Sequence, residues 1–404
     1  MLIVHPPDDG VISGKVELPP SKSHANRLLA LQLLHDNNLQ LTNAGESDDV
    51  RIMQLAVDHP ESSIVDVGHA GTAMRFLTAC FSVLEGERII TGSKRMKERP
   101  IAPLVNALRS LGAEIDYVEK DGFPPLRITS GGLAGSEVTI RGDISSQYIS
   151  ALMLIGTVLP DGLRIQLEGT VLSFPYIEMT AATINQIGGV VEINKEQVTV
   201  RKGIEPDRTV SIEKDWSAAA FLLESAALSK DCDVLLEGLS GTSLQGDKRA
   251  LELWEMFGLK VTEEDGGVRI RKNGTVSIPD SVDFLNHPDL AQPFAATIAG
   301  LGRSCRLTGL DNLRIKETDR IEALIKELTK AGTVCRSEGN DLILPPGQLN
   351  GEFTFDTYSD HRMAMSLAPL SLKLGTVKIN DPEVVSKSYP RFWNALEVIG
   401  FNLE

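Results

Sequence analysis

The chain has 404 residues, of which 42% are hydrophobic and 24% are charged, and its 55 acidic against 40 basic side chains give a formal net charge of −15. This length exceeds what a single hydrophobic core usually sustains, so we expect two domains. The acidic balance argues against a nucleic-acid-binding protein, and the apolar runs are too short or too interrupted to span a membrane.

The cysteines and histidines give no sign of a disulfide framework or a metal site. The four cysteines, Cys80, Cys232, Cys305 and Cys335, lie far apart without a C-x-x-C pair, so we expect reduced and mostly buried thiols. The seven histidines lack metal-ligand spacing, and we expect neither a metal nor another cofactor. The start of the sequence lacks the pattern of a signal or transit peptide, which favours a cytoplasmic location.

One pattern recurs six times along the chain: a short β-like run, a cluster of small polar residues, and an Ala/Leu-rich helical segment. In chain order the clusters are residues 20–23, 69–72, 145–147, 215–217, 287–289 and 359–361. Markers within them are spaced by 50 residues at first and by 71 to 74 residues afterwards. The sequence therefore predicts six repeats, of which the first is short.

A second marker has the same period. Gly112, Gly188, Gly258, Gly332 and Gly400 each end a predicted helix and precede a strand, where glycine suits a left-handed cap. Each repeat holds a strand, a helix, a strand, a second helix and β-rich sequence, which indicates an α/β fold. We expect an N-terminal three-repeat domain over residues 15–214 and a C-terminal three-repeat domain over residues 215–404. The first strand, residues 1–14, is expected to join the C-terminal domain.

All six polar clusters fall at predicted helix starts, where free backbone N–H groups favour anions. Helix capping alone is the simpler interpretation of any one cluster, but six at a constant phase weaken it. Lys22 and Arg27 follow the first cluster, and compact basic runs occur at residues 94–99 and 314–320. A solvated surface is the alternative for these runs, although guanidinium groups just before helices also bind carboxylates and phosphates.

Several runs together resemble the signatures of 5-enolpyruvylshikimate-3-phosphate synthases, in order from residue 10 to about residue 395. They include residues 19–27, 71–75, 95–100, 145–147, 312–320 and 360–365, and the last two are the most specific. The resemblance implies two domains, each of three βαβαββ repeats around a pseudo-threefold axis, with a ligand cleft between domains. It also implies transfer of the enolpyruvyl group of phosphoenolpyruvate to the 5-hydroxyl of shikimate 3-phosphate, with release of phosphate.

The resemblance also assigns binding residues. For shikimate 3-phosphate they are Lys22, Ser23, Arg27, Ser145, Ser146, Gln147, Ser173, Tyr176, Asp289, Asn312 and Lys316. For phosphoenolpyruvate they are Lys22, Gly71, Arg99, Gln147, Arg320, Arg362 and Lys387. The basic groups of this second set, Lys22, Arg99, Arg320, Arg362 and Lys387, are also expected to bind glyphosate in competition with phosphoenolpyruvate. His69, Phe76, Pro20 and Phe174 depart from the family's usual residues.

The reaction needs proton transfer, for which we expect Asp289 as the base and Glu317 as the proton donor, with Lys22 as a competing donor. Neighbouring cations would favour the charged form of Glu317, which counts against its role. His361 either shares the proton transfer or has a structural role.

Two alternatives remain. A UDP-N-acetylglucosamine enolpyruvyl transferase would carry a reactive Cys in a Gly-rich loop, and a non-enzymatic anion-binding scaffold would not need the acid and base groups. We expect small-molecule substrates, no nucleic-acid or membrane partner, and a monomer.

Overall fold

The computed structural model describes residues 1–35, 39–129, 132–205, 207–351 and 353–404. The chain divides into unit 1, Met1–Ser21 with Glu213–Glu404, and unit 2, Lys22–Ile212. Each unit has its own cluster of buried hydrophobic residues. The division places residues 15–21 with the C-terminal half, whereas the sequence-based boundary placed them in the N-terminal domain. Those domain limits stay a prediction.

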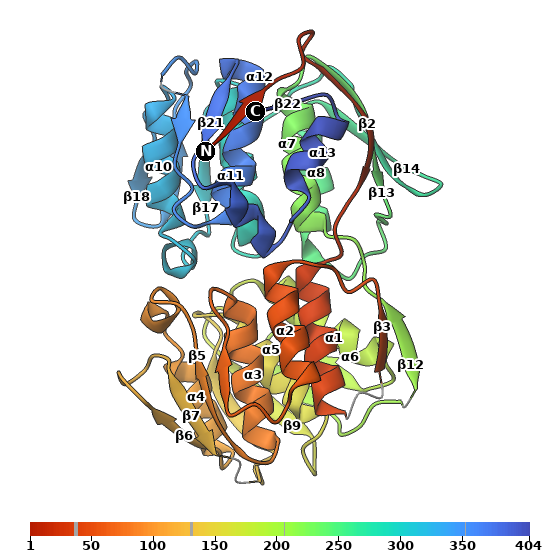
Figure 1. Cartoon of the computed structure of the whole chain (residues 1–404), viewed down its shortest axis with the longest axis vertical. Helices are drawn as coiled ribbons and strands as arrows, with labels where there is room; N and C mark the ends of the chain where they lie inside the picture. Colours follow the sequence, from red (N-terminus) through yellow and green to blue (C-terminus); the bar gives the residue numbers. More distant parts are fainter. Residues whose placement is uncertain (36–38, 130–131, 206, 352) are drawn as a thin grey trace. The chain divides into compact units, whose positions relative to one another are not determined.

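The sheets of unit 1 share one strand topology, in which a parallel pair is extended by two antiparallel strands. Within the described residues of unit 1 this order occurs three times, and Figure 1 shows β2, β13 and β14 of one such sheet together. The sheets are β2 (Val11–Glu17), β13 (Asp231–Glu237), β15 (Gly267–Lys272) and β14 (Leu259–Glu264); β16 (Ser281–Asp283), β17 (Cys305–Thr308), β19 (Asp341–Leu344) and β18 (Arg336–Glu338); and β20 (Thr354–Phe355), β21 (Val377–Ile379), β1 (Leu2–His5) and β22 (Asn402–Leu403).

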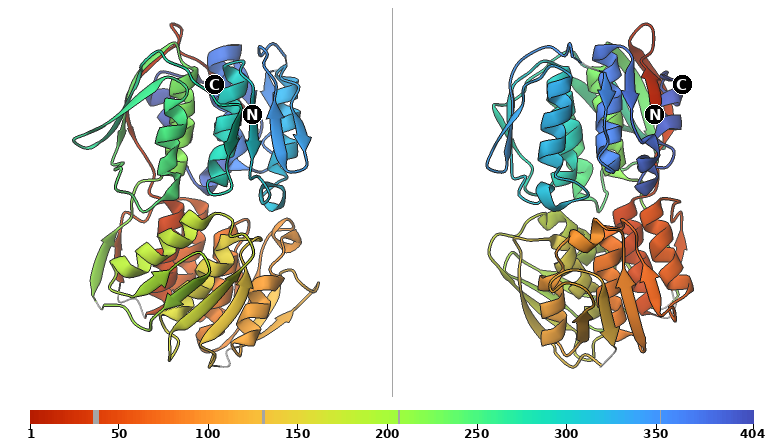
Figure 2. Two further views of the ribbon diagram at one scale, coloured as in Figure 1. Left: turned by 180° about the vertical axis from the view of Figure 1, so that it is seen from behind. Right: turned by 60° about the vertical axis from the view of Figure 1, so that its left-hand side comes forward.

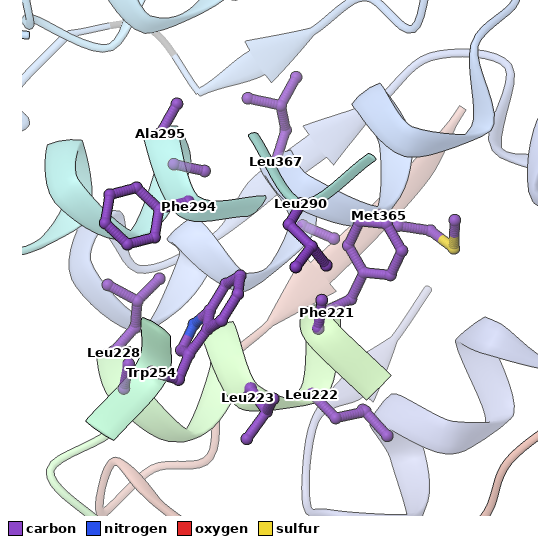
Figure 3. Packing of buried hydrophobic residues seen from close by; sticks show 14 of the residues in the cluster. Phe221, Leu222, Leu223, Leu228, Trp254, Leu290, Phe294, Ala295, Met365 and Leu367 are labelled. Carbon is purple, nitrogen blue, oxygen red and sulfur yellow. The ribbon is translucent and has the colours of Figure 1, made fainter. Parts of the chain in front are cut away.

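Three inner helices of unit 1 contact one another and form the centre of its core: α7 (Trp216–Leu228), α9 (Ala291–Gly300) and α11 (His361–Leu367). Their residues are buried on nearly every side, as expected for helices enclosed by other elements. Phe221, Phe294 and Met365 come from different inner helices and lie in one apolar region (Figure 3). The outer helices are α8 (Ala250–Glu255), α10 (Arg320–Lys330), α12 (Ser371–Leu374) and α13 (Phe392–Val398). The short 3-10 helices are η2 (Gly246–Arg249), η3 (Pro288–Leu290), η4 (Leu313–Ile315), η5 (Ala368–Leu370) and η6 (Pro382–Lys387).

Unit 2 repeats this plan with one shortened sheet (Figure 2). Its inner helices α1 (Lys22–Leu34), α3 (Gly71–Val83) and α5 (Ser146–Gly156) contact one another. The outer helices are α2 (Asp48–Asp58), α4 (Ala102–Ser110) and α6 (Phe174–Gln186), with the 3-10 turn η1 (Met96–Glu98). The sheets are β4 (Ile64–Asp66), β5 (Glu87–Thr91), β7 (Leu126–Thr129) and β6 (Glu114–Tyr117); β8 (Glu137–Arg141), β9 (Leu163–Glu168), β11 (Gln197–Val200) and β10 (Val191–Ile193); and the pair β3 (Leu39–Thr42) and β12 (Arg208–Ser211).

The pair β3–β12 explains why the first repeat is short. The other sheets of unit 2 add two antiparallel strands after their second helix, but in the described chain α2 is followed directly by β4 of the next repeat. The missing strand pair accounts for the reduced spacing of 50 residues seen in the sequence.

Two strands do not join the repeat that follows them in the chain. β2 precedes α1, yet it pairs with β13 beside α7, and β12 precedes α7, yet it pairs with β3 beside α1. The two crossing segments bond to each other: Ser21 N–H donates to Glu213 O at 2.7 Å, and Asp215 N–H donates to Pro19 O at 2.9 Å. The units are therefore connected by two chain segments paired side by side.

The predicted helix ends and thiols are confirmed. The five glycines after helices have φ between 79° and 108°, in the left-handed region. All four cysteines are free and buried, and burial raises the pKa of the Cys80 thiol to about 12.

Glu224 on α7 provides a stability prediction. Its side chain is fully buried, neither carboxyl oxygen has a hydrogen-bond partner among the described residues, and burial raises its pKa well above the usual range. The pKa of Glu224 is higher in the folded than in the unfolded protein. Its contribution to the free energy of unfolding is therefore fully present below the unfolded pKa and is lost as pH rises towards the folded pKa. Relative to Glu224→Gln, the wild-type free energy of unfolding should fall above about pH 4.5, by up to about 1.4 kcal/mol per pH unit.

Urea unfolding at pH 5 and pH 8 measures this difference. Glu255→Gln on α8, where the carboxyl is exposed, is the control and should show no such pH dependence. Equal pH dependence of the wild type and Glu224→Gln would contradict the prediction.

Candidate active site

Lys22 is the first residue of α1, and its ammonium nitrogen lies 3.0 Å from Asp49 Oδ2 on α2. The Lys22 side chain is 15% exposed and that of Asp49 is 3% exposed. The pair fixes the ammonium group at the start of an inner helix, where backbone N–H groups also favour anions. Sequence reasoning assigned no role to Asp49, which is 27 residues away in the chain.

Arg27 lies one helical turn further along α1 and is 2% exposed. It donates hydrogen bonds to the carbonyl oxygens of Ser23 and Tyr176 at 2.7 and 2.9 Å, to Thr180 Oγ1 at 2.7 Å, and to Ser150 Oγ at 3.4 Å. In the described chain all its partners are neutral, and burial lowers its pKa to about 10. Arg27 thus holds α6 against α1 while keeping an uncompensated positive charge, which favours a nearby anion.

The starts of α3 and α5 also meet within unit 2. Gln147 Nε2 donates to Thr72 Oγ1 at 3.1 Å, and Ser145 Oγ accepts from Gln147 N–H at 3.3 Å. The capping interpretation is therefore correct for Ser145, and Gln147 is oriented towards the helix that begins at Gly71.

Arg99 lies directly against Gly71. A Cβ atom at Gly71 would lie 2.5 Å from Arg99 Nη1, well inside contact distance. Arg75, four residues along α3, fixes the segment that carries Arg99 by donating to the carbonyl oxygens of Gly71 and Pro100, both at 3.2 Å. The hydroxyl of Tyr148 donates to the same Pro100 oxygen. Sequence reasoning gave Arg75 and Tyr148 no role, because only the fold shows their shared partner.

This close contact makes Gly71→Ala a test of the subsite. The methyl group must displace the Arg99 guanidinium, and overpacking of this kind costs about 1–3 kcal/mol. We expect the KM for phosphoenolpyruvate to rise and the inhibition constant of glyphosate to rise by a larger factor. Steady-state kinetics measures both. Gly347→Ala, where an added Cβ meets nothing within 4 Å, is the control. Unchanged constants in Gly71→Ala would remove Gly71 from the subsite.

In unit 1, Arg320 at the start of α10 bonds to three carboxylates and is 2% exposed. Its Nε lies 2.7 Å from Asp360 Oδ2, its Nη1 3.1 Å from Asp289 Oδ1, and its Nη2 2.9 Å from Glu317 Oε2. Burial alone would lower the pKa of Arg320, but the three carboxylates outweigh burial and raise it. Arg320 therefore joins the starts of α9, α10 and α11.

Two further cations complete this cluster. Arg362 on α11 donates to Asp289 Oδ2 at 2.7 Å and to the Asp289 carbonyl oxygen at 3.1 Å. Lys387 Nζ lies 3.7 Å from Glu317 Oε1. The term carboxylate cluster is used below for these six residues: Arg320, Arg362, Lys387, Asp289, Glu317 and Asp360. Its three positive and three negative charges balance. The expected base, Asp289, and the expected proton donor, Glu317, contact the same cations that were expected to bind phosphoenolpyruvate.

The structure thus divides the predicted site residues between the units. Unit 2 contains Lys22, Ser23, Arg27, Gly71, Arg99, Ser145, Ser146, Gln147, Ser173 and Tyr176. Unit 1 contains Asp289, Asn312, Lys316, Glu317, Arg320, Arg362 and Lys387.

Three of the residues that depart from the family's usual residues lie in unit 2. His69 Nδ1 bonds Ser93 Oγ at 3.1 Å, the Phe76 ring lies 5.6 Å from the Arg27 guanidinium, and Phe174 is the first residue of α6.

Among the described residues no group of His, Cys, Asp or Glu has the geometry of a metal site, and no helix is long and apolar enough to cross a membrane. Polar groups instead gather near the starts of the inner helices and of α10, as buried cations beside small residues and acid groups. This arrangement defines an α/β enzyme for small anionic substrates.

The family model described as EPSP synthase (3-phosphoshikimate 1-carboxyvinyltransferase) matches residues 53–396. The 3-phosphoshikimate 1-carboxyvinyltransferase of Bacteroides fragilis is 42% identical over 97% of each chain, and that of Shewanella pealeana is 36% identical over 95% and 96% of the two chains. An EPSP synthase structure from Acinetobacter baumannii covers 100% of this chain and 99% of its own, with a TM-score of 0.78 and 21% identity. The chain belongs to the EPSP synthase family.

Family membership confirms the predicted family and enzyme class, and the structural match confirms the two-domain α/β fold. The pseudo-threefold axis stays a prediction, supported by three inner helices and repeated sheet topology in each unit.

Proposed function

We propose that this chain transfers the enolpyruvyl group of phosphoenolpyruvate to the 5-hydroxyl of shikimate 3-phosphate and releases phosphate, as a step of the shikimate pathway towards chorismate. The observation that carries this proposal is the carboxylate cluster, in which acid and base groups contact buried cations at helix starts. Both substrates are phosphorylated anions, and phosphoenolpyruvate also has a carboxylate. Guanidinium groups suit both kinds of anion.

The reaction proceeds by addition and then elimination. The 5-hydroxyl oxygen bonds to C2 of phosphoenolpyruvate as its proton leaves, and C3 takes up a proton to become a methyl group. The tetrahedral intermediate then loses phosphate together with a proton from that methyl group, which restores the double bond. Positioned acid and base groups are worth about 10²–10⁴ in rate for such transfers.

Asp289 is the proposed base, because its carboxylate is held between two guanidinium groups at fixed distances. Glu317 is the proposed proton donor, and Lys22 competes for that role. Arg320 at 2.9 Å and Lys387 at 3.7 Å favour the carboxylate form of Glu317 in the free enzyme. When the substrate anions bind these cations, that stabilisation of the carboxylate weakens, and Glu317 becomes easier to protonate.

The proposed binding sets are those expected from the sequence. Shikimate 3-phosphate binds Lys22, Ser23, Arg27, Ser145, Ser146, Gln147, Ser173, Tyr176, Asp289, Asn312 and Lys316, and phosphoenolpyruvate binds Lys22, Gly71, Arg99, Gln147, Arg320, Arg362 and Lys387. Each unit contains part of each proposed set. A monomeric state and a cytoplasmic location also stay predictions.

A phosphate-release assay with the purified chain tests the function. Release should require phosphoenolpyruvate and shikimate 3-phosphate together. Release with UDP-N-acetylglucosamine in place of shikimate 3-phosphate would favour the related transferase. Binding of both compounds without phosphate release would favour a non-enzymatic scaffold.

A further inference from the structure

Helix α10 contacts the segment before α11 at two points. Arg320 and Glu327 are seven residues apart, which is about two helical turns, so they lie on the same face of the helix. Arg320 bonds to Asp360 at the end of the segment, and Glu327 bonds to residues at its beginning. This segment, residues 356–360, is called the clamped segment below.

Glu327 is fully buried and uses both carboxylate oxygens. Oε2 accepts a hydrogen bond from the backbone N–H of Asp356 at 3.0 Å, and Oε1 accepts one from the Tyr358 hydroxyl. Lys330 Nζ lies 2.9 Å from Glu327 Oε1 and 2.8 Å from Asp356 Oδ2. Asn380 donates to the other oxygen of Asp356 at 2.7 Å. One buried carboxylate thus fixes both the backbone and a side chain of the clamped segment.

The clamped segment has a conformation that it would not adopt without support. Tyr358 and Ser359 both have left-handed backbone angles, with φ of 54° and 55°, and neither is glycine. Side chains with a Cβ disfavour this region, and such residues persist only where their surroundings hold them. The bonds from Glu327 at one end and Arg320 at the other provide that support.

The conformation of this segment sets the positions of two cations. Asp360 Oδ1 accepts the N–H of Arg362 at 2.9 Å, which caps α11, and Asp360 Oδ2 bonds Arg320 Nε at 2.7 Å. If the segment relaxes, Asp360 leaves its place. The Arg320 guanidinium then loses a partner that orients it, and α11, which carries Arg362, loses its cap. Glu327 itself contacts neither guanidinium in the described structure.

We propose that Glu327 is a positioning residue, which holds the clamped segment in its left-handed conformation and thereby orients Arg320 and Arg362 for the phosphoenolpyruvate anion. The inference rests on the proposed function for the identity of that anion. The other reading is that Glu327 only stabilises unit 1, in which case its loss would affect folding and not the binding of one substrate.

Glu327→Ala tests the proposal, with Leu324→Ala as a matched control that shortens a fully buried core side chain on the same helix. We expect Glu327→Ala to raise the KM for phosphoenolpyruvate at least about tenfold, while the KM for shikimate 3-phosphate changes less than about twofold. Leu324→Ala should lower the melting temperature but change neither KM by more than about twofold.

A second substitution and hydrogen exchange further distinguish a positioning role of Glu327 from a purely stabilising one. Adding Ser359→Gly to Glu327→Ala removes a Cβ from a left-handed position, so we expect part of the affinity for phosphoenolpyruvate to return. Exchange of the backbone amides of residues 360–364 should be faster in Glu327→Ala than in the wild type and unchanged in Leu324→Ala.

The proposal is overturned if Glu327→Ala keeps the wild-type KM for phosphoenolpyruvate, or if Leu324→Ala raises that KM equally. An inactive wild type would refute the proposed function instead, and the exchange experiment would still decide whether Glu327 holds the segment.

Discussion

Asp289→Asn is expected to lower the turnover number by at least about 100-fold, because loss of a positioned base typically costs about 10²–10⁴ in rate. The amide has nearly the same shape as the carboxylate, and its single oxygen can still accept a hydrogen bond from Arg320 or Arg362, although its NH2 group replaces the second acceptor. It cannot take a proton from the 5-hydroxyl of shikimate 3-phosphate. Turnover should therefore fall far more than substrate affinity, and steady-state kinetics with calorimetric binding of shikimate 3-phosphate measures the two effects separately.

The chain offers a close control for this substitution. Asp233 on β13 also bonds two guanidinium groups, those of Arg269 and Arg271, but on an exposed sheet surface of the same unit. Asp233→Asn removes the same charge from beside two guanidinium groups, outside the carboxylate cluster, and should leave turnover within about twofold of the wild type. Near-normal turnover in Asp289→Asn would exclude Asp289 as the base.

The sequence predicts the local features of this fold well. Helix starts at polar clusters and left-handed glycines at helix ends depend on neighbouring residues, and the structure confirms both. The sequence also shows the short spacing between the first two polar clusters, but it does not show the cause of that spacing. That cause is the missing strand pair after α2, and strand pairing is decided by residues far apart in the chain.

The sequence indicated that a first strand joins the C-terminal domain, but the pairing partners of β2 and β12 could not be predicted, for the same reason. β12 pairs with β3 although 169 positions separate Thr209 from its partner Gln40. No periodic pattern specifies such a partner, because a strand with suitable apolar residues fits several sheet edges.

The partners of charged residues were the least predictable part of the site. The motifs identified Lys22, Arg320 and Arg362, but their carboxylate partners follow only from tertiary structure. Asp360 is 40 residues from Arg320, and Asp289 is 73 residues from Arg362. Glu327 lies in an ordinary amphipathic helix, and its sequence position gives no sign that it is fully buried.

Lys22→Met is expected to reduce kcat/KM for phosphoenolpyruvate by about 100-fold. The substitution removes an ammonium group at the start of α1, and a hydrogen bond to a charged group is worth about 1.5–3 kcal/mol. The same change also removes a cation from Asp49, which is 3% exposed. Loss of one partner of a buried ion pair typically destabilises by about 3 kcal/mol or more, so the single variant combines a binding effect with a stability effect.

The double variant Lys22→Met with Asp49→Asn separates the two effects. Replacing the buried carboxylate by a neutral amide should return most of the lost free energy of unfolding, measured by urea denaturation. It cannot return the ammonium group that phosphoenolpyruvate needs, so kcat/KM should stay about 100-fold below the wild type. If the double variant regained wild-type kcat/KM together with stability, Lys22 would act only as the partner of Asp49, and its place in the phosphoenolpyruvate subsite would be wrong.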